Sequence, residues 1–105
     1  VFYQLSGMAL AFFDRKALAD DQGRPDVRLG TGAITLAQNF NTEVEVDAAY
    51  AEAIKAGAEP LKKPQKVFWG GYSGYYSDPD GHVWEVAFNP FSPLDEEGNF
   101  ILSKE

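Results

Sequence analysis

A single carboxylate lies in the middle of an apolar run near the C-terminal end of the chain. Glu85 stands in the segment DGHVWEVAFNP, whose valines and aromatic residues predict a strand. Because alternate residues of a strand share a face, Glu85 points the same way as Val83 and Ala87. A buried carboxylate without a partner costs several kcal/mol, so Glu85 must face a metal, a ligand, a hydrogen-bonding neighbour or water. It is the first candidate for a binding group or, with a raised pKa, a general base.

A run rich in aromatic and hydroxyl side chains, WGGYSGYYS, precedes this strand. Trp69, Ser73 and Tyr75 would line a binding site for a flat or apolar ligand if they share a face with Glu85. The same part of the chain holds three further rings, those of Tyr72, Tyr76 and Trp84. Strand aromatics also serve simply as core, and the sequence leaves both interpretations open.

Metal-binding residue types are scarce. The chain has one histidine, His82, and no cysteine. His82 follows the turn Asp78–Gly81 and is three residues from Glu85, an odd separation that puts the two side chains on opposite faces of a strand. A catalytic zinc site takes three protein ligands, and a non-haem iron oxygenase site takes two histidines and a carboxylate. The iron site is therefore excluded for this chain alone, and we expect no metal or other cofactor.

Composition narrows the class of protein. The 105 residues imply one domain, and the net charge of −7 argues against a nucleic-acid surface, which needs a basic patch. No apolar run approaches the roughly 20 residues of a membrane span, and no signal peptide is visible. The lack of cysteine fits a cytoplasmic protein. A small lysine cluster, Lys62, Lys63 and Lys66, is best explained as protection of an exposed sheet edge.

One long helix and two hairpins must position these residues. The helix is expected over 42–58, where Thr42 and Glu45 form a capping box and Gly57 suits the left-handed position after the last turn. Its apolar stripe, which should pack on the sheet, is Val46, Ala49, Tyr50, Ala53 and Ile54. The other expected elements are a hairpin over 1–13, a short helical turn within 14–23, a loop over 23–32, strands over 32–40 and 59–69, and a second hairpin over 70–90.

Residues 68–98, with the strand and helix before them, resemble the vicinal oxygen chelate superfamily, which includes glyoxalase I, bleomycin-resistance proteins and extradiol dioxygenases. The run FWGGYSGYYSDPDGHVWEVAFNPFSPLDEEG is most similar to uncharacterised bacterial glyoxalase-family proteins. The resemblance implies an α+β fold in which paired βαβββ modules form a curved mixed sheet around a cup. Residues 1–31 would be the remnant of a first module without its opening strand and helix, 32–90 the second module, and 91–105 a tail.

The resemblance also implies a place for a divalent metal, held by ligands on the first and last strands of each module. Glu85 matches the last-strand glutamate and is the one position that carries over. The first-strand position aligns with Ala33, or with Gly32 or Ile34 if the register slips, and none of these side chains binds a metal. We therefore expect a metal-free protein that binds a small organic molecule in an aromatic-rich cup, through Glu85, Trp69, Ser73 and Tyr75.

Two alternatives remain open at this point. One is a divalent-metal-dependent lyase or dioxygenase of the glyoxalase kind, completed by ligands from absent N-terminal residues. The other is a dimerising domain without a ligand. In either case an incomplete first module leaves apolar residues of 1–13 uncovered, and such patches mark interfaces. We expect a homodimer, with the 1–13 hairpin and Phe91–Leu94 at or near its interface.

Overall fold

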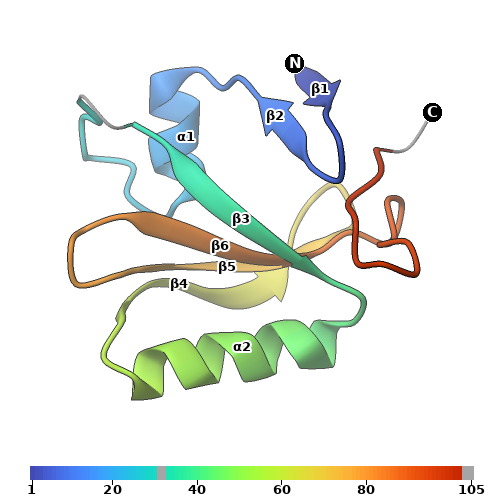
Figure 1. The fold of residues 1–105 in the computed structure, drawn as a ribbon. Helices are drawn as coiled ribbons and strands as arrows, with labels where there is room; N and C mark the ends of the chain where they lie inside the picture. Colours follow the sequence, from blue (N-terminus) through green and yellow to red (C-terminus); the bar gives the residue numbers. More distant parts are fainter. Residues whose placement is uncertain (31–32, 103–105) are drawn as a thin grey trace.

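The computed structural model describes residues 1–30 and 33–102 of the chain (Figure 1). The elements in chain order are β1 (Phe2–Gln4), β2 (Ala9–Ala11), α1 (Arg15–Asp21), β3 (Thr35–Phe40), α2 (Glu43–Lys55), β4 (Glu59–Lys66), β5 (Tyr72–Ser77) and β6 (Val83–Phe88). Both predicted hairpins are present, and the short helical turn expected within 14–23 is the helix α1.

The segment from β3 to β6 forms a βαβββ module. Its four strands lie in the order β3-β6-β5-β4, with β3 parallel to β6 and the other neighbours antiparallel. Helix α2 covers one face of this sheet, while α1 and the hairpin lie on the other side (Figure 1). The predicted α+β class and one βαβββ module are therefore confirmed, whereas the predicted bounds 32–90, a second module and a curved cup stay predictions.

Helix α2 forms where its caps and its apolar stripe agree. The Thr42 hydroxyl accepts a hydrogen bond from the backbone N–H of Glu45 at 3.1 Å, which caps the N-terminus. The helix ends at Lys55, before Gly57, whose φ of +111° is strained for any residue with a side chain. Val46 and Tyr50 are buried against Val86 of β6, in a cluster that also holds Ile54. Four of the five residues of the predicted stripe are therefore in this cluster, namely Val46, Ala49, Tyr50 and Ile54.

The β5–β6 turn is built as the sequence predicts. The N–H of Gly81 donates to the carbonyl of Asp78 at 2.9 Å, and Gly81 has a φ of +86°. The Asp78 carboxylate accepts from the backbone N–H of His82 at 2.9 Å and from the Trp84 indole at 3.1 Å. These contacts fix the point at which β6 starts, and with it which of its side chains face α2.

The N-terminal hairpin packs on the tail rather than on the module core. Gln4 of β1 donates to the carbonyl of Phe100 at 2.9 Å and accepts from the N–H of Leu102 at 2.7 Å. Large apolar side chains of this hairpin remain exposed, namely Val1, Phe2, Tyr3, Leu5, Met8, Leu10, Phe12 and Phe13. In the described part of the chain, no helix is long and apolar enough to cross a membrane.

Candidate functional site

Glu85 lies in a row of side chains that crosses the whole sheet. Its register partner on β3 is Ala37, its partner on β5 is Tyr75, and Tyr75 is in turn paired with Lys62 on β4. The alternate residues of the same strands, including Val86 and Tyr76, pack under α2. Glu85 therefore faces away from α2, as the strand alternation predicts.

Helix α1 lies over this face and is held there by polar contacts. The Tyr75 hydroxyl donates to the carboxylate of Asp21, the last residue of α1. The ammonium group of Lys62 donates to the Asp21 carbonyl at 3.2 Å. The next residue, Gln22, is buried, and its amide donates to the Thr35 hydroxyl of β3 at 2.8 Å. Side chains from β4, β5 and α1 thus converge around Glu85.

The surroundings of Glu85 favour its neutral form. Burial, and then the negative charge of Asp21, raise the pKa of the Glu85 carboxyl to about 7. Hydrogen bonds from Tyr75 and Ser73 and the charge of Lys62 oppose this rise without cancelling it. Its neighbours along the same face of β6, Val83 and Ala87, are buried apolar residues, which explains the desolvation. At neutral pH the group is close to half protonated, the condition that suits an acid or a base.

Tyr75 is fixed as a neutral hydrogen-bonding group. The side chain is 2% exposed. Burial, the charge of Glu85 and the hydrogen bond to Asp21 raise the pKa of the Tyr75 hydroxyl above its ordinary value. Two carboxylates surround one phenolic proton, so Tyr75 links Asp21 to Glu85.

The structure brings together three of the four predicted binding residues. Ser73 and Tyr75 alternate on the same face of β5 as Glu85 on β6. Trp69 is instead in the turn between β4 and β5, where its ring packs so closely on Gly71 that an added Cβ would lie 2.0 Å from a ring carbon. The rings of Tyr72 and Tyr76 belong to the core under α2. Of the β5 rings, Tyr75 therefore lies on the face of Glu85, and the aromatic-rich cup stays a prediction.

The sequence did not predict that Asp21 and Lys62 lie near Glu85. Lys62 was interpreted as an exposed edge lysine, but β4 is shifted in register on both sides of it, and its side chain reaches α1. The two β4 prolines, Pro60 and Pro64, were the local signal that simple alternation fails there. No local sequence pattern indicates Asp21, because its contact with Tyr75 depends on where α1 packs on the sheet.

The residues present do not fit the metal that the resemblance implies. Ala33 lies beside the small apolar cluster of Leu18, Ala19 and Leu29 and offers no donor, while the alternative position Gly32 is outside the described residues. Ile34 is apolar as well. Across residues 1–30 and 33–102, no three or more His, Asp or Glu side chains are grouped so that they could hold an ion. Glu85 with Asp21 falls short of a three-ligand site on this chain alone.

Two open cavities lie away from the Glu85 row, which consists of Ala37, Glu85, Tyr75 and Lys62. One, of about 370 Å³, lies between α2 and the sheet and is lined by residues that include Gln38, Phe40 and Glu52. The other, of about 340 Å³, is lined by residues of α1 and by the loop that follows it. Glu85 itself is half-buried, and neither of these two cavities is lined by it.

Comparison with known proteins agrees with the fold. Residues 4–86 match the family model of the Glyoxalase/Bleomycin resistance protein/Dioxygenase superfamily. A glyoxalase-related enzyme from Fulvimarina pelagi is 34% identical, with a TM-score of 0.66; the match covers 97% of this chain and 73% of that protein. A comparison with curated proteins gives no match.

Two further solved structures are similar over a little more than half of this chain. A glyoxalase/bleomycin resistance protein from Albidiferax ferrireducens is 27% identical, with a TM-score of 0.52, over 58% of this chain and 50% of that one. A family enzyme from Burkholderia phytofirmans is 27% identical, with a TM-score of 0.51, over 52% of this chain and 43% of that one. The family model covers most of the chain, and the observed βαβββ module agrees with it. The chain therefore belongs to the glyoxalase/bleomycin resistance protein/dioxygenase superfamily.

Proposed function

We propose that the chain binds a small organic molecule on the sheet face opposite α2, with Glu85 as the group that exchanges a hydrogen bond or a proton with it. The observation that carries this proposal is the convergence of Tyr75, Lys62 and Asp21 on a half-buried carboxyl. Structural carboxylates lie mostly at the surface or in ion pairs. Glu85 has neither arrangement, because the Lys62 ammonium group bonds to the Asp21 carbonyl.

The positions of the protons on Tyr75 and Glu85 explain how Glu85 would bind a ligand. Tyr75 has one hydroxyl proton, and it goes to Asp21. A protonated Glu85 can then donate its own proton to the Tyr75 oxygen. An ionised Glu85 must instead compete with Asp21 for the Tyr75 hydroxyl proton or accept a hydrogen bond from a ligand. A ligand with a hydroxyl or amide donor would therefore satisfy the ionised form. The same exchange is what a general base needs.

Acid–base chemistry on a small substrate is one use of such a site. The related Fulvimarina pelagi protein is named a glyoxalase-related enzyme, which supports this use. The proposed role of Glu85 does not depend on a metal, because the donors among residues 1–30 and 33–102 do not complete a metal site.

The test is an NMR screen of the purified protein against a set of small hydroxy- and amide-bearing aromatic compounds. A binder should shift the amides of Ser73, Tyr75 and Ala87, and Glu85→Gln should reduce its affinity at least tenfold. Glu96→Gln, which removes the same charge from the exposed tail, should leave the affinity unchanged. Shifts confined to other surfaces, or equal losses in both variants, would contradict the proposal.

Metal analysis of the same samples addresses the alternative of a metalloenzyme. Stoichiometric zinc, nickel, manganese or iron that is lost with Glu85→Ala would replace the metal-free proposal. We expect no such loss, because Ala33 and the residues near it supply no further ligand.

We also propose that the chain forms a homodimer through the hairpin of β1 and β2. Its rings pack mainly on one another, with Phe2 and Phe13 centroids 6.4 Å apart and Tyr3 and Phe12 centroids 6.0 Å apart, and all four stay more than half exposed. A stable interface needs more than roughly 1,000 Å² in total, and this patch is the best candidate. Light scattering at micromolar concentration should give twice the 11.6 kDa of the chain. A soluble 11.6 kDa monomer would contradict this assembly.

A further inference from the structure

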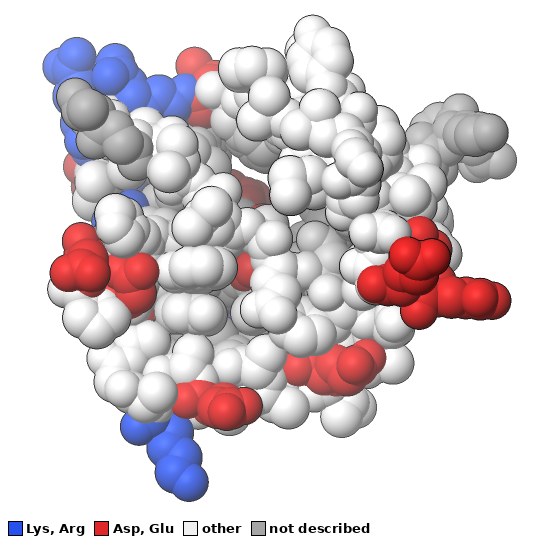
Figure 2. Space-filling model, viewed as in Figure 1, with Lys and Arg blue, Asp and Glu red and all other residues white. Residues whose placement is uncertain are grey.

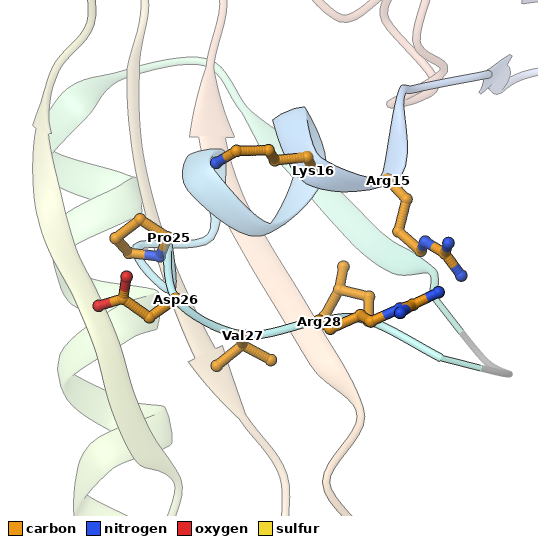
Figure 3. A pocket seen from close by; sticks show the side chains of 7 residues that line it. Arg15, Lys16, Pro25, Asp26, Val27 and Arg28 are labelled. Atoms are coloured by element: carbon orange, nitrogen blue, oxygen red, sulfur yellow. The ribbon is translucent and has the colours of Figure 1, made fainter.

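The cavity beside α1 brings two arginine side chains together. Arg15 comes from the start of α1, and Arg28 comes from the loop after it. Figure 3 shows their guanidinium groups pointing toward each other, while the Lys16 ammonium group and the Asp26 carboxylate point to the other side. The remaining lining is formed by Pro25, Val27 and Leu29.

Neither of these two positive charges has an ion-pair partner in the part of the chain that the structure describes. Within residues 1–30 and 33–102, neither Arg15 nor Arg28 has a hydrogen bond or an ion pair, whereas Arg24 donates to Gln22 at 2.6 Å and Lys16 pairs with Asp20 at 3.4 Å. The chain as a whole carries a net charge of −7. Even so, Lys and Arg gather at this corner of the surface (Figure 2). Two facing guanidinium groups repel each other unless an anion lies between them.

The backbone on both sides of the cavity is held in place. Leu18 and Ala19 of α1 pack on Leu29, the residue after Arg28, and all three are buried. This cluster fixes the helix that carries Arg15 relative to the loop that carries Arg28. The fold therefore sets the spacing of the two backbone positions that carry Arg15 and Arg28 before any ligand binds.

We infer that this cavity binds the oxyanion group of a small molecule, a carboxylate or a phosphate, between Arg15 and Arg28. A guanidinium group presents a planar set of donors that matches two oxygens of either anion. Pro25, Val27 and Leu29 supply an apolar wall for the rest of the molecule, and a volume of about 340 Å³ suits a small ligand. This site is separate from the Glu85 row and does not rest on the function proposed for it.

The experiment is an NMR titration of the full chain with inorganic phosphate and, separately, with acetate, at an ionic strength held constant with sodium chloride. At least one anion should cause saturable shifts of the Arg15 and Arg28 side-chain N–H signals and of the amides of residues 26–29. The tighter of the two identifies the oxyanion that the site prefers. Shifts that fail to saturate, or that chloride reproduces, would overturn the inference.

Matched variants separate binding at this site from general charge effects. The double variant Arg15→Gln with Arg28→Gln should weaken binding at least tenfold. The control, Lys55→Gln with Lys63→Gln, removes the same charge from α2 and β4 and should bind as the wild type does. Both arginines are exposed, so unchanged amide signals of β5 and β6 will show that the double variant is folded. Equal loss in both double variants, or none in the arginine variant, would contradict the assignment.

Discussion

The two faces of the sheet are built from the same strands but carry different kinds of side chain, an apolar core on one face and a polar cluster on the other. On the α2 face, Val46 and Tyr50 bury Val86, and rings of Tyr72, Tyr76 and Phe88 pack around them. On the other face, the residues one step away place Glu85, Tyr75 and Lys62 in a row under the end of α1. A two-residue period therefore separates an apolar core from a polar cluster. Substitutions on the first face should change stability at every pH, and those on the second should change how stability and protonation depend on pH.

Tyr50→Ala should have the largest effect. The ring is 8% exposed and packs edge-on against Tyr76 at a centroid distance of 6.3 Å. Its loss removes buried area and leaves a cavity, so the free energy of unfolding should fall by about 3 kcal/mol. Urea denaturation at pH 5 and pH 8 should give the same loss. An unchanged stability would show that α2 is not packed through this ring.

Glu85→Gln should stabilise the protein at high pH. The folded-state pKa of about 7 lies above the ordinary value of 4.5, so the folded chain binds this proton more tightly than the unfolded chain does. Stability from this group is complete below pH 4.5 and is lost as the pH rises through 7. Glutamine stays neutral, so the variant should be more stable than the wild type at pH 8.5 by up to about 3 kcal/mol.

The pH dependence of this difference is the check. The gap between Glu85→Gln and the wild type should shrink toward pH 5, where both side chains are neutral. Denaturant unfolding across pH 5 to 8.5 measures it directly. A gap that grows toward low pH would mean that the folded protein lowers the pKa of Glu85, and the burial argument would be wrong.

Asp21→Asn and Lys62→Gln should move the titration of Glu85 in opposite directions. Asp21 raises the pKa of Glu85 by its charge, so its replacement should lower the midpoint, and the Tyr75 proton released from Asp21 would lower it further. Lys62 lowers that pKa, so Lys62→Gln should raise the midpoint. Carboxyl-carbon NMR of Glu85 reads both changes. A shift of the Glu85 midpoint in the same direction in both variants would contradict the proposed interaction between α1 and Glu85.

Tyr50→Phe should have the smallest effect. The Tyr50 hydroxyl is buried and has no hydrogen-bond partner among the described residues. Its removal leaves the ring packing intact and relieves an unsatisfied group, so stability should be unchanged or slightly higher. A loss as large as that of Tyr50→Ala would show that the hydroxyl, rather than the ring, holds α2 in place.

The sequence predicted the local elements of the module well because their signals are local. Thr42 and Glu45 cap α2, Gly57 ends it, and Asp78 with Gly81 makes the β5–β6 turn. The direction of Glu85 followed from strand alternation once β6 was identified. Trp69 was not brought into the row, because the chain turns between β4 and β5 before the alternation of β5 begins.

By itself, then, the sequence determined the module, the face on which Glu85 lies and the family resemblance, since each depends on residues close together in the chain. Only the tertiary structure decided what surrounds Glu85. Asp21 is distant in sequence and reaches Tyr75 because α1 docks on the sheet, and Lys62 joins them because irregular pairing turns its part of β4 toward α1. That Arg15 and Arg28 line one cavity likewise depends on the packing of Leu18 and Ala19 against Leu29. Contacts of this kind depend on how whole elements pack, and no local pattern records that.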